Sequence, residues 1–399
     1  MEQNPLSRRV TSLAESQTIG MSKLSRELSA KGIDIVNLSL GEPDFVTPLH
    51  IREAAKKAID EGYTFYPPIS GYAELRKAIS AKFKRENNLD YAPDQVVVST
   101  GAKQSIANVV LCLVNPGDEV IIPLPYWVSY IEIVKLAEGI TVPISAGIES
   151  EFKITPAQLE AAITPKTKLF IFSSPCNPTG SVYTKAELKA LADVFAKHPG
   201  IFILSDEIYE HINFLDVHQS IAQFDFLKDR VIIVNGVSKG YAMTGWRIGY
   251  IGAPKYIADA CDKMQGQFTS AASSIAQKAA EAALTLDNHP TMEMKDAFLR
   301  RRNLVLGLMK DIPGIILNEP KGAFYLFPDV SSYFGKSDGE TRINNASDLC
   351  MYLLHKGHVS LVTGDAFGEP NCVRFSYAAA DEKLIEAVKR IRQALSLLK

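Results

Sequence analysis

The stretch Val231-Ile232-Ile233-Val234-Asn235-Gly236-Val237-Ser238-Lys239-Gly240 decides how the rest of this 399-residue chain is interpreted. Its first four residues are all β-branched, a pattern that predicts a strand buried on both faces. The Asn and Gly that follow predict a turn at the carboxyl end of that strand. Lys239 is unusual there, because a lysine is seldom placed where its ammonium loses water. Eight residues later, Arg247 lies in Thr244-Gly245-Trp246-Arg247-Ile248-Gly249-Tyr250.

A lysine followed by an arginine in this way suits a carbonyl cofactor that carries a phosphate. A neutral amine forms a Schiff base with an aldehyde, and a guanidinium binds a phosphate through two hydrogen bonds. The pair therefore indicates pyridoxal 5'-phosphate (PLP). Two other interpretations stay open at this point. Lys239 can be a solvated loop residue, and Gly236-Val237-Ser238-Lys239-Gly240 also matches the G-x-S-x-G nucleophile elbow of serine hydrolases, with Ser238 as the nucleophile.

The composition is that of an ordinary globular protein, with 46% hydrophobic and 22% charged residues. The formal net charge of −2 indicates neither nucleic acid nor an anionic membrane as a partner. The apolar runs are too short to span a bilayer, and the first residues lack the apolar core of a secretion signal, so we expect a cytoplasmic protein. Five widely spaced cysteines indicate free thiols. No motif predicts a metal site.

Apolar runs alternate with helical patterns from about residue 95 to residue 255. The predicted strands are 96–99, 119–122, 169–173, 201–205 and 231–234, and the predicted helices include 103–114 and 185–196. This alternation predicts an α/β fold in which a mostly parallel sheet is covered by helices on both faces. Ligands bind beyond the carboxyl ends of the strands in such sheets, so the polar residues at those ends are the candidates for a site.

The chain beyond about residue 300 has a different pattern. Its predicted helices are 299–309, 346–356 and 383–398, and its predicted strands are 323–327 and 372–376. This mixture predicts a second, smaller α+β domain. A long helix over 256–286, continuing past Pro290, is the predicted link between the two parts.

The first predicted strand ends in Thr100-Gly101-Ala102-Lys103, which opens a helix. Small residues let the backbone approach a phosphate, and the free N–H groups of a helix N-terminus favour an anion. The segment is therefore a candidate phosphate site. A plain turn from strand to helix is the alternative.

Other strand ends offer groups that suit a flat, charged ring. Asp206 follows the strand 201–205, where a carboxylate is costly unless it is paired. A pyridinium nitrogen would pair with it, although metal and nucleotide sites also use such an acid. Tyr209 and Asn177 could donate hydrogen bonds to a phenolate oxygen. Trp127 could stack on the ring, or it could be an ordinary core residue.

Taken together, these residues resemble one family. The chain is similar over almost its whole length to the class I aminotransferases, the aspartate-aminotransferase-like group within the fold type I PLP enzymes. The resemblance implies a large PLP-binding domain over residues 50–300, a small domain from residues 1–49 and 301–399, and a homodimer with shared active sites. It is carried by Gly41-Glu42-Pro43-Asp44-Phe45, Tyr66, Gly101-Ala102-Lys103, Pro125-Tyr126-Trp127, Asn177-Pro178-Thr179-Gly180, Asp206-Glu207-Ile208-Tyr209, Ser238-Lys239, Gly245-Trp246-Arg247-Ile248-Gly249 and Arg374-Phe375-Ser376.

The resemblance also implies a role for each matching residue. Lys239 holds the cofactor covalently and then moves a proton. Asp206 pairs with the ring nitrogen, Tyr209 and Asn177 bind the ring oxygen, and Trp127 stacks on the ring. The remaining implied contacts are Ser238, Arg247, Gly101, Ala102 and Lys103 to the phosphate, Tyr66 to the phosphate of the neighbouring subunit, and Arg374, Gly41, Trp127 and Asn177 to the substrate.

The resemblance is nearest to a bacterial and plant subgroup that binds the distal substrate carboxylate through a lysine and a threonine, here Lys103 and Thr18. It implies an aspartate transaminase that converts L-aspartate and 2-oxoglutarate into oxaloacetate and L-glutamate. An aromatic-amino-acid or prephenate aminotransferase is the alternative within the family. A serine hydrolase using Ser238 and a PLP-binding regulator without catalysis are more distant ones.

Overall fold

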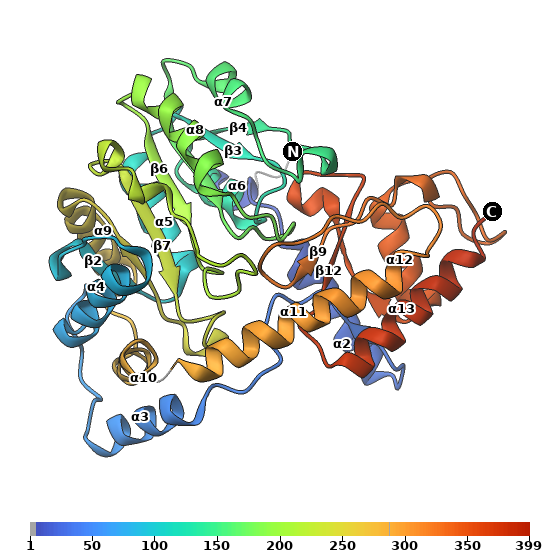
Figure 1. Cartoon of the computed structure of the whole chain (residues 1–399), viewed down its shortest axis with the longest axis horizontal. Helices are drawn as coiled ribbons and strands as arrows, with labels where there is room; N and C mark the ends of the chain where they lie inside the picture. The colour runs from blue at the N-terminus through green and yellow to red at the C-terminus, as the bar shows by residue number, and fades with distance from the viewer. Residues whose placement is uncertain (1–4, 287) are drawn as a thin grey trace.

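The structure, a computed structural model, describes residues 5–286 and 288–399 (Figure 1). A large body built on a seven-stranded sheet and a smaller body with two short sheets lie side by side. Helix α11, His289–Met309, runs from the large body along the small one. The division into residues 50–300 and the remainder stays a prediction, and its boundary falls within this helix.

The large sheet has the strand order β2-β8-β7-β6-β5-β3-β4, and of these strands β8 runs against its two neighbours. The prediction of a mostly parallel sheet is confirmed, and the carboxyl ends of the other strands meet at one edge. The strands are β2 (Val96–Ser99), β3 (Glu119–Pro123), β4 (Ile140–Ile144), β5 (Thr167–Ser173), β6 (Phe202–Asp206), β7 (Val231–Gly236) and β8 (Gly249–Gly252).

Both faces of this sheet are buried, because alternate residues of each strand pack against different helices. On β5, Leu169 and Ile171 belong to one core cluster, whereas Phe170 and Phe172 belong to another. Burial on both sides explains why the strands read as continuous apolar runs. One face packs against α5 (Ala102–Leu113), α6 (Ser129–Leu136) and α9 (Lys255–Phe268), and the other against α3 (Leu49–Asp60), α4 (Ala73–Asn87), α7 (Pro156–Ala162), α8 (Lys185–Lys197) and α10 (Ser274–Thr285).

The small body combines the N-terminal segment with the C-terminal part of the chain. Its parallel pair is β1 (Val36–Asn37) with β10 (Val359–Ser360), and its antiparallel sheet is β11 (Val362–Thr363), β12 (Val373–Ser376) and β9 (Tyr325–Leu326). Its helices are α2 (Gln17–Ala30), α12 (Ala346–Lys356) and α13 (Asp381–Ser396), whereas the short helix α1 (Arg8–Thr11) lies against the large body, where Arg9 pairs with Glu138. The predicted mixture of helices and short strands is confirmed.

The predicted link, one helix over 256–286, is wrong. Helix α9 ends at Phe268, and Ser270 has φ +61°, a left-handed conformation that cannot continue a right-handed helix. Helix α10 begins anew, with the hydroxyl of Ser273 accepting a hydrogen bond from Ala276 N. The connecting helix is α11 instead, which starts ten residues before the predicted 299–309. Serine is an unusual residue for a left-handed helix end, so the sequence carries no clear stop signal.

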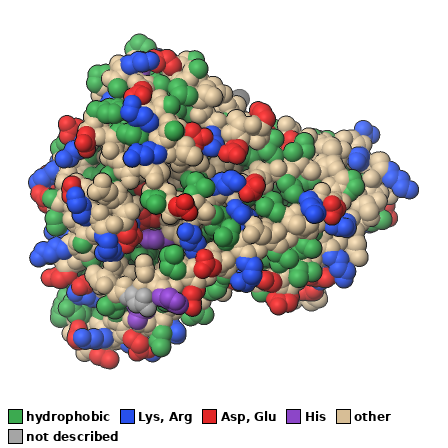
Figure 2. Space-filling view, in the orientation of Figure 1, with side chains coloured by type: hydrophobic (Ala, Val, Ile, Leu, Met, Phe, Trp, Pro, Cys, Tyr) green, Lys and Arg blue, Asp and Glu red, His purple; other side chains and the backbone are tan. Residues whose placement is uncertain are grey.

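On the face drawn in Figure 2, positive and negative side chains are interspersed. This distribution agrees with the formal net charge of −2. Within residues 5–286 and 288–399, no helix is both long and apolar enough to cross a membrane.

Candidate active site

A cavity of about 440 Å³ opens at the carboxyl edge of the large sheet and is lined by residues of both bodies. Most of the residues predicted from the sequence converge on it. Those lining the cavity are Thr18, Gly41, Ala102, Lys103, Trp127, Asn177, Asp206, Tyr209, Ser238, Lys239, Arg247 and Arg374.

Lys239 lies in the turn after β7 and is partly accessible through the cavity. Its Nζ donates a hydrogen bond to the carbonyl oxygen of Gly41. Burial lowers its pKa to about 8; the carboxylate of Glu42 opposes this shift, and the nearby cations Arg374 and Arg247 add to it. An amine with this pKa is partly neutral near pH 7, as a nucleophile or base must be.

Asp206 ends β6 and is 5% exposed. One carboxylate oxygen accepts a hydrogen bond from the Tyr130 hydroxyl at 2.6 Å, and the other accepts one from Ile208 N at 3.2 Å. Burial nevertheless raises its pKa to about 6. Since the structure shows no ion pair to this carboxylate among the residues it describes, the position suits a cationic ring nitrogen.

Arg374, on β12, is 2% exposed and only partly hydrogen-bonded. Its Nη1 donates to Asn177 Oδ1 at 3.0 Å, and its Nη2 donates to the Ser39 carbonyl at 2.6 Å. The guanidinium carbon lies 4.7 Å from the centroid of the Tyr325 ring. Its Nε has no hydrogen-bond partner within the described part of the chain. A buried guanidinium with an unused donor suits a carboxylate ligand.

Tyr209 faces the cavity next to a second buried hydroxyl. Its oxygen lies 2.7 Å from the hydroxyl of Tyr325. A Cβ atom at Gly41 would overlap that Tyr325 hydroxyl, so the glycine makes room for it. The cavity therefore holds two tyrosine hydroxyls beside Asn177, and they could donate to an anionic ring oxygen.

The opposite end of the cavity has the features of a phosphate cradle. Gly101, at φ +82°, precedes α5, and a Cβ atom on it would overlap Arg247 Nη2. A Cβ atom on Gly249 would overlap Ala102 N, so the start of α5 packs against bare backbone. Arg247 itself is left-handed, with φ +59°, a strain of about 1–2 kcal/mol that is typical of functional sites. With the Ser238 side chain, these groups fit a phosphate at a helix N-terminus.

The substrate end is more open. The Lys103 Nζ lies 5.0 Å from the centroid of the Trp127 ring. The Lys103 side chain is exposed, but the partial loss of water around its ammonium, and then the charge of Arg247, lower its pKa. Helix α2 brings Thr18 and Arg26 to the wall of the cavity. Lysine and arginine at this opening favour an anionic substrate.

Two predicted residues lie outside the cavity lining, and several lining residues were not predicted. Gly101 lies just behind the lining, against Arg247, and Tyr66 is 95% exposed. Tyr325 belongs to the predicted apolar strand 323–327, where nothing marks its hydroxyl. Other missed lining residues with polar side chains include Tyr130, Ser39 and Arg26. Tyr130 follows Trp127 by one helical turn, the only signal that could have found it.

The serine hydrolase interpretation requires a histidine near Ser238. No histidine of the described chain lines this cavity. His211 and His218 instead pair with Glu86 and Glu207. Ser238 therefore lacks the base that a hydrolase needs.

One known group uses all these features at once: an aldehyde for the amine, a ring nitrogen for the buried acid, and a phosphate for the helix start. The fold and the cavity thus define a PLP enzyme of fold type I. Residues 33–391 match the family "Aminotransferase class I and II", and the chain belongs to this family, which uses PLP.

Curated relatives and solved structures agree with this assignment. The chain is 49% identical to the "Bifunctional aspartate aminotransferase and glutamate/aspartate-prephenate aminotransferase" of Petunia hybrida, over 99% of this chain and 83% of that one. It is 49% identical to the "Aspartate/prephenate aminotransferase" of Cereibacter sphaeroides, over 94% and 95%. The crystal structure of the aspartate aminotransferase from Rhizobium meliloti superposes with a TM-score of 0.96 at 41% identity, covering 100% of both chains.

Proposed function

We propose that the protein is an aspartate transaminase that moves the amino group of L-aspartate to 2-oxoglutarate. The observation that carries this is the distribution of cations in the cavity. Arg374 lies deep and buried, whereas Lys103 lies at the opening. A substrate with an α-carboxylate and a distal carboxylate would match both. The names of the relatives support the same substrate.

Bound PLP supplies an aldehyde that accepts the amino group and a ring that withdraws electrons. Asp206 would hold positive charge on the ring nitrogen, and Arg374 would orient the α-carboxylate. Lys239 Nζ would then remove the proton from the substrate Cα, because its lowered pKa leaves it able to accept one. Asn177 links the substrate-binding group to the ring-binding groups, since its Oδ1 already accepts from Arg374.

An absorbance spectrum from about 300 to 500 nm, taken before and after adding L-aspartate, tests the proposal. We expect a cofactor band that shifts on addition of aspartate and returns on addition of 2-oxoglutarate. A cofactor band that aspartate leaves unchanged would keep the family and reject the substrate. The absence of any band after incubation with PLP would overturn the cofactor assignment as well.

Prephenate is a second candidate acceptor, because both curated relatives named above include it in their names. Prephenate is larger than 2-oxoglutarate but also carries two carboxylates, so Lys103 and Arg374 suit it equally. Competition between the two oxo acids at fixed aspartate would rank them. An aromatic amino acid that turns over faster than aspartate would instead favour the aromatic alternative.

We also propose a homodimer with shared active sites. Phe65 and Tyr66 are 82% and 95% exposed, while the Ser274 hydroxyl binds the Phe65 carbonyl at 2.9 Å and fixes the segment. Aromatic side chains held in this way on a surface suggest a partner that covers them. Co-expressing Lys239→Ala with Tyr66→Ala tests sharing: one site of the mixed dimer would be intact, giving about one quarter of wild-type activity. No recovery would place Tyr66 in its own subunit's site. A cytoplasmic location stays a prediction.

A further inference from the structure

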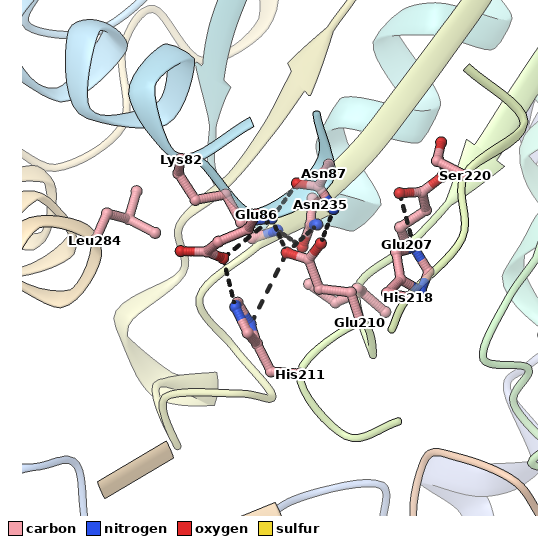
Figure 3. Close-up of polar contacts among 12 residues, drawn as sticks. Lys82, Glu86, Asn87, Glu207, Glu210, His211, His218, Ser220, Asn235 and Leu284 are labelled. Atoms are coloured by element: carbon pink, nitrogen blue, oxygen red, sulfur yellow. Dashed lines mark hydrogen bonds and ion pairs between the residues drawn. The ribbon is translucent and has the colours of Figure 1, made fainter. Parts of the chain in front are cut away.

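A buried cluster of charged and polar side chains, none of which lines the cavity, surrounds Glu210 (Figure 3). Glu210, 6% exposed, is its centre. Its Oε1 accepts from Asn235 Nδ2 at 2.8 Å and also pairs with Lys82 Nζ, and its Oε2 accepts from Asn87 Nδ2 at 2.8 Å. Lys82 Nζ donates to Asn87 Oδ1 at 2.9 Å as well.

The cluster sets one buried ammonium against two carboxylates. Lys82 is fully buried, so its ammonium depends on Glu210 and on Glu86, which lies 3.7 Å away. Burial alone would raise the pKa of Glu210, but Lys82, His211 and His218 outweigh it and hold the pKa well below its usual range. Carboxylates and histidines here could also ligate a metal ion. The Lys82 ammonium already supplies the cation, so we interpret the cluster as a structural ion pair.

The cluster joins the two chain segments that carry the reacting groups. Backbone pairing of β6 with β7 continues to Glu207 N, which donates to the Val234 carbonyl. Beyond that point, Glu210 follows Tyr209 directly, and Asn235 precedes Lys239 by four residues. The hydrogen bond between Glu210 and Asn235 therefore links the Tyr209 segment to the Lys239 segment beyond the end of the β6–β7 pairing.

A neighbouring carboxylate secures the same segment next to Asp206. Glu207, 1% exposed, accepts hydrogen bonds from the hydroxyls of Ser205 at 2.9 Å and Ser220 at 2.6 Å, and it pairs with His218 at 3.0 Å. Asp206 and Tyr209 line the cavity, whereas Glu207 and Glu210 do not. The motif thus places two groups in the cavity and two outside its lining.

We propose that Glu210, held by Lys82 and Asn235, is a positioning residue that sets where Tyr209 and Asp206 lie relative to Lys239. It touches neither substrate nor cofactor. It acts through the Tyr209 segment, and Asn87 and Lys82 brace it from α4. The inference rests on the proposed function only for the choice of assay substrate.

The test compares Glu210→Gln with a control at Arg230, which lies just before β7, the strand whose other end carries Asn235. Glu210→Gln leaves the Lys82 ammonium with only the more distant Glu86 as a charged partner, and it faces Asn87 with a second donor. A misplacement of about 1 Å can cost about 100-fold, so we expect kcat to fall about tenfold or more with KM within about twofold. We also expect the pH midpoint of the bound-cofactor absorbance to move by about half a unit or more.

Arg230→Met is the matched control. Arg230 precedes β7 and binds the carbonyls of Phe195, His198 and Ile201, so its loss weakens the fold away from the cavity. We expect a lower Tm in both variants, but an unchanged kcat and absorbance midpoint in Arg230→Met. If Glu210→Gln likewise lowers only the Tm, the positioning role is rejected.

A double variant adds a rescue and guards against failure to fold. In Lys82→Met/Glu210→Gln no charge is stranded, and the new amide can donate to Asn87 Oδ1, which Lys82 no longer occupies. We expect kcat and the absorbance midpoint to recover at least partly relative to Glu210→Gln. Should Glu210→Gln not fold, Asn235→Ala, which removes the hydrogen bond to Glu210 together with the one that Asn235 Oδ1 accepts from Gly236 N, must still lower kcat and move the midpoint, or the proposal is rejected. The absorbance titration needs no amino acid, so its result stands even if aspartate is not the substrate.

Discussion

The inner wall of the cavity and its rim hold their side chains in different ways. The inner wall consists of Asn177, Asp206, Tyr209, Lys239 and Arg374, and the rim consists of Thr18, Ile19, Arg26 and Lys103. Four inner-wall residues are buried, and Lys239 is partly so. On the rim, Ile19 is 62% exposed, and the only residues of α2 that are buried are two serines.

The comparison shows that the residues proposed for chemistry are largely buried, whereas those proposed to select the substrate are exposed to solvent. On the inner wall, Asp206 ends β6 and Lys239 follows β7, and burial shifts the pKa of both. Rim residues meet solvent and can change with little effect on the core. Changes on the inner wall should therefore lower the rate for every substrate, whereas changes on the rim should alter the choice between substrates.

The largest expected effect is that of Lys239→Ala. Loss of both nucleophile and base should lower kcat by about 10⁴-fold or more, since general base catalysis alone contributes about 10²–10⁴-fold. Steady-state turnover of aspartate with 2-oxoglutarate measures it. Near-normal turnover would remove Lys239 from the mechanism and with it the idea of a catalytic inner wall.

Arg374→Ala should cost about 2–5 kcal/mol in kcat/KM, because a buried charged partner of the substrate is lost. The loss should be the same for dicarboxylic and monocarboxylic amino acids, which share the α-carboxylate. Arg374→Lys keeps the charge but loses the planar guanidinium that binds a carboxylate through two hydrogen bonds. Its kcat/KM should therefore lie between those of the wild type and Arg374→Ala. A loss confined to dicarboxylic substrates would move Arg374 to the distal group.

Lys239 should destabilise the protein when the cofactor is absent. Its pKa is about 8 in the fold against an ordinary 10.5, so below pH 8 the unfolded chain holds this proton more tightly. Lys239→Met should therefore be more stable than the cofactor-free wild type at pH 7, by about 2–3 kcal/mol. The advantage should shrink as pH rises from 8 to 10.5. Urea unfolding at several pH values measures it, and a pH-independent difference would contradict the assigned pKa.

The smallest expected effect is on the rim. Lys103→Ala should raise KM for aspartate and 2-oxoglutarate about tenfold, which corresponds to about 1.5 kcal/mol of lost binding. The effect is small because solvent weakens an exposed charge pair. A monocarboxylic amino acid should be nearly unaffected. Equal effects on both would remove Lys103 from distal recognition and erase the distinction between rim and inner wall.

Features of the fold and site that depend on neighbouring residues can be predicted from the sequence, whereas those that depend on contacts between residues far apart in the chain cannot. The buried strands and the residues at their ends followed from local pattern, because continuous β-branched runs such as Val231 to Val234 seldom occur outside buried strands. Tyr325 and Tyr130 were missed, since each meets its partner, Tyr209 or Asp206, only through the fold. The break at Ser270 was missed for the same reason. The implied roles of the site residues remain predictions.

Part of the shape of the active site depends on glycines, which leave space where any other residue would place a Cβ atom. A Cβ at position 41, 101 or 249 would overlap the Tyr325 hydroxyl, the Arg247 guanidinium or the Ala102 amide, respectively. Gly249 lies on β8 and does not line the cavity, yet any side chain there would push the start of α5 out of place. Mutational tolerance is therefore a poor guide to chemistry in this protein. A saturation scan would score Gly249 as indispensable although it meets no reactant, and glycine intolerance would outline the shape of the cofactor site more faithfully than it would identify the groups that react.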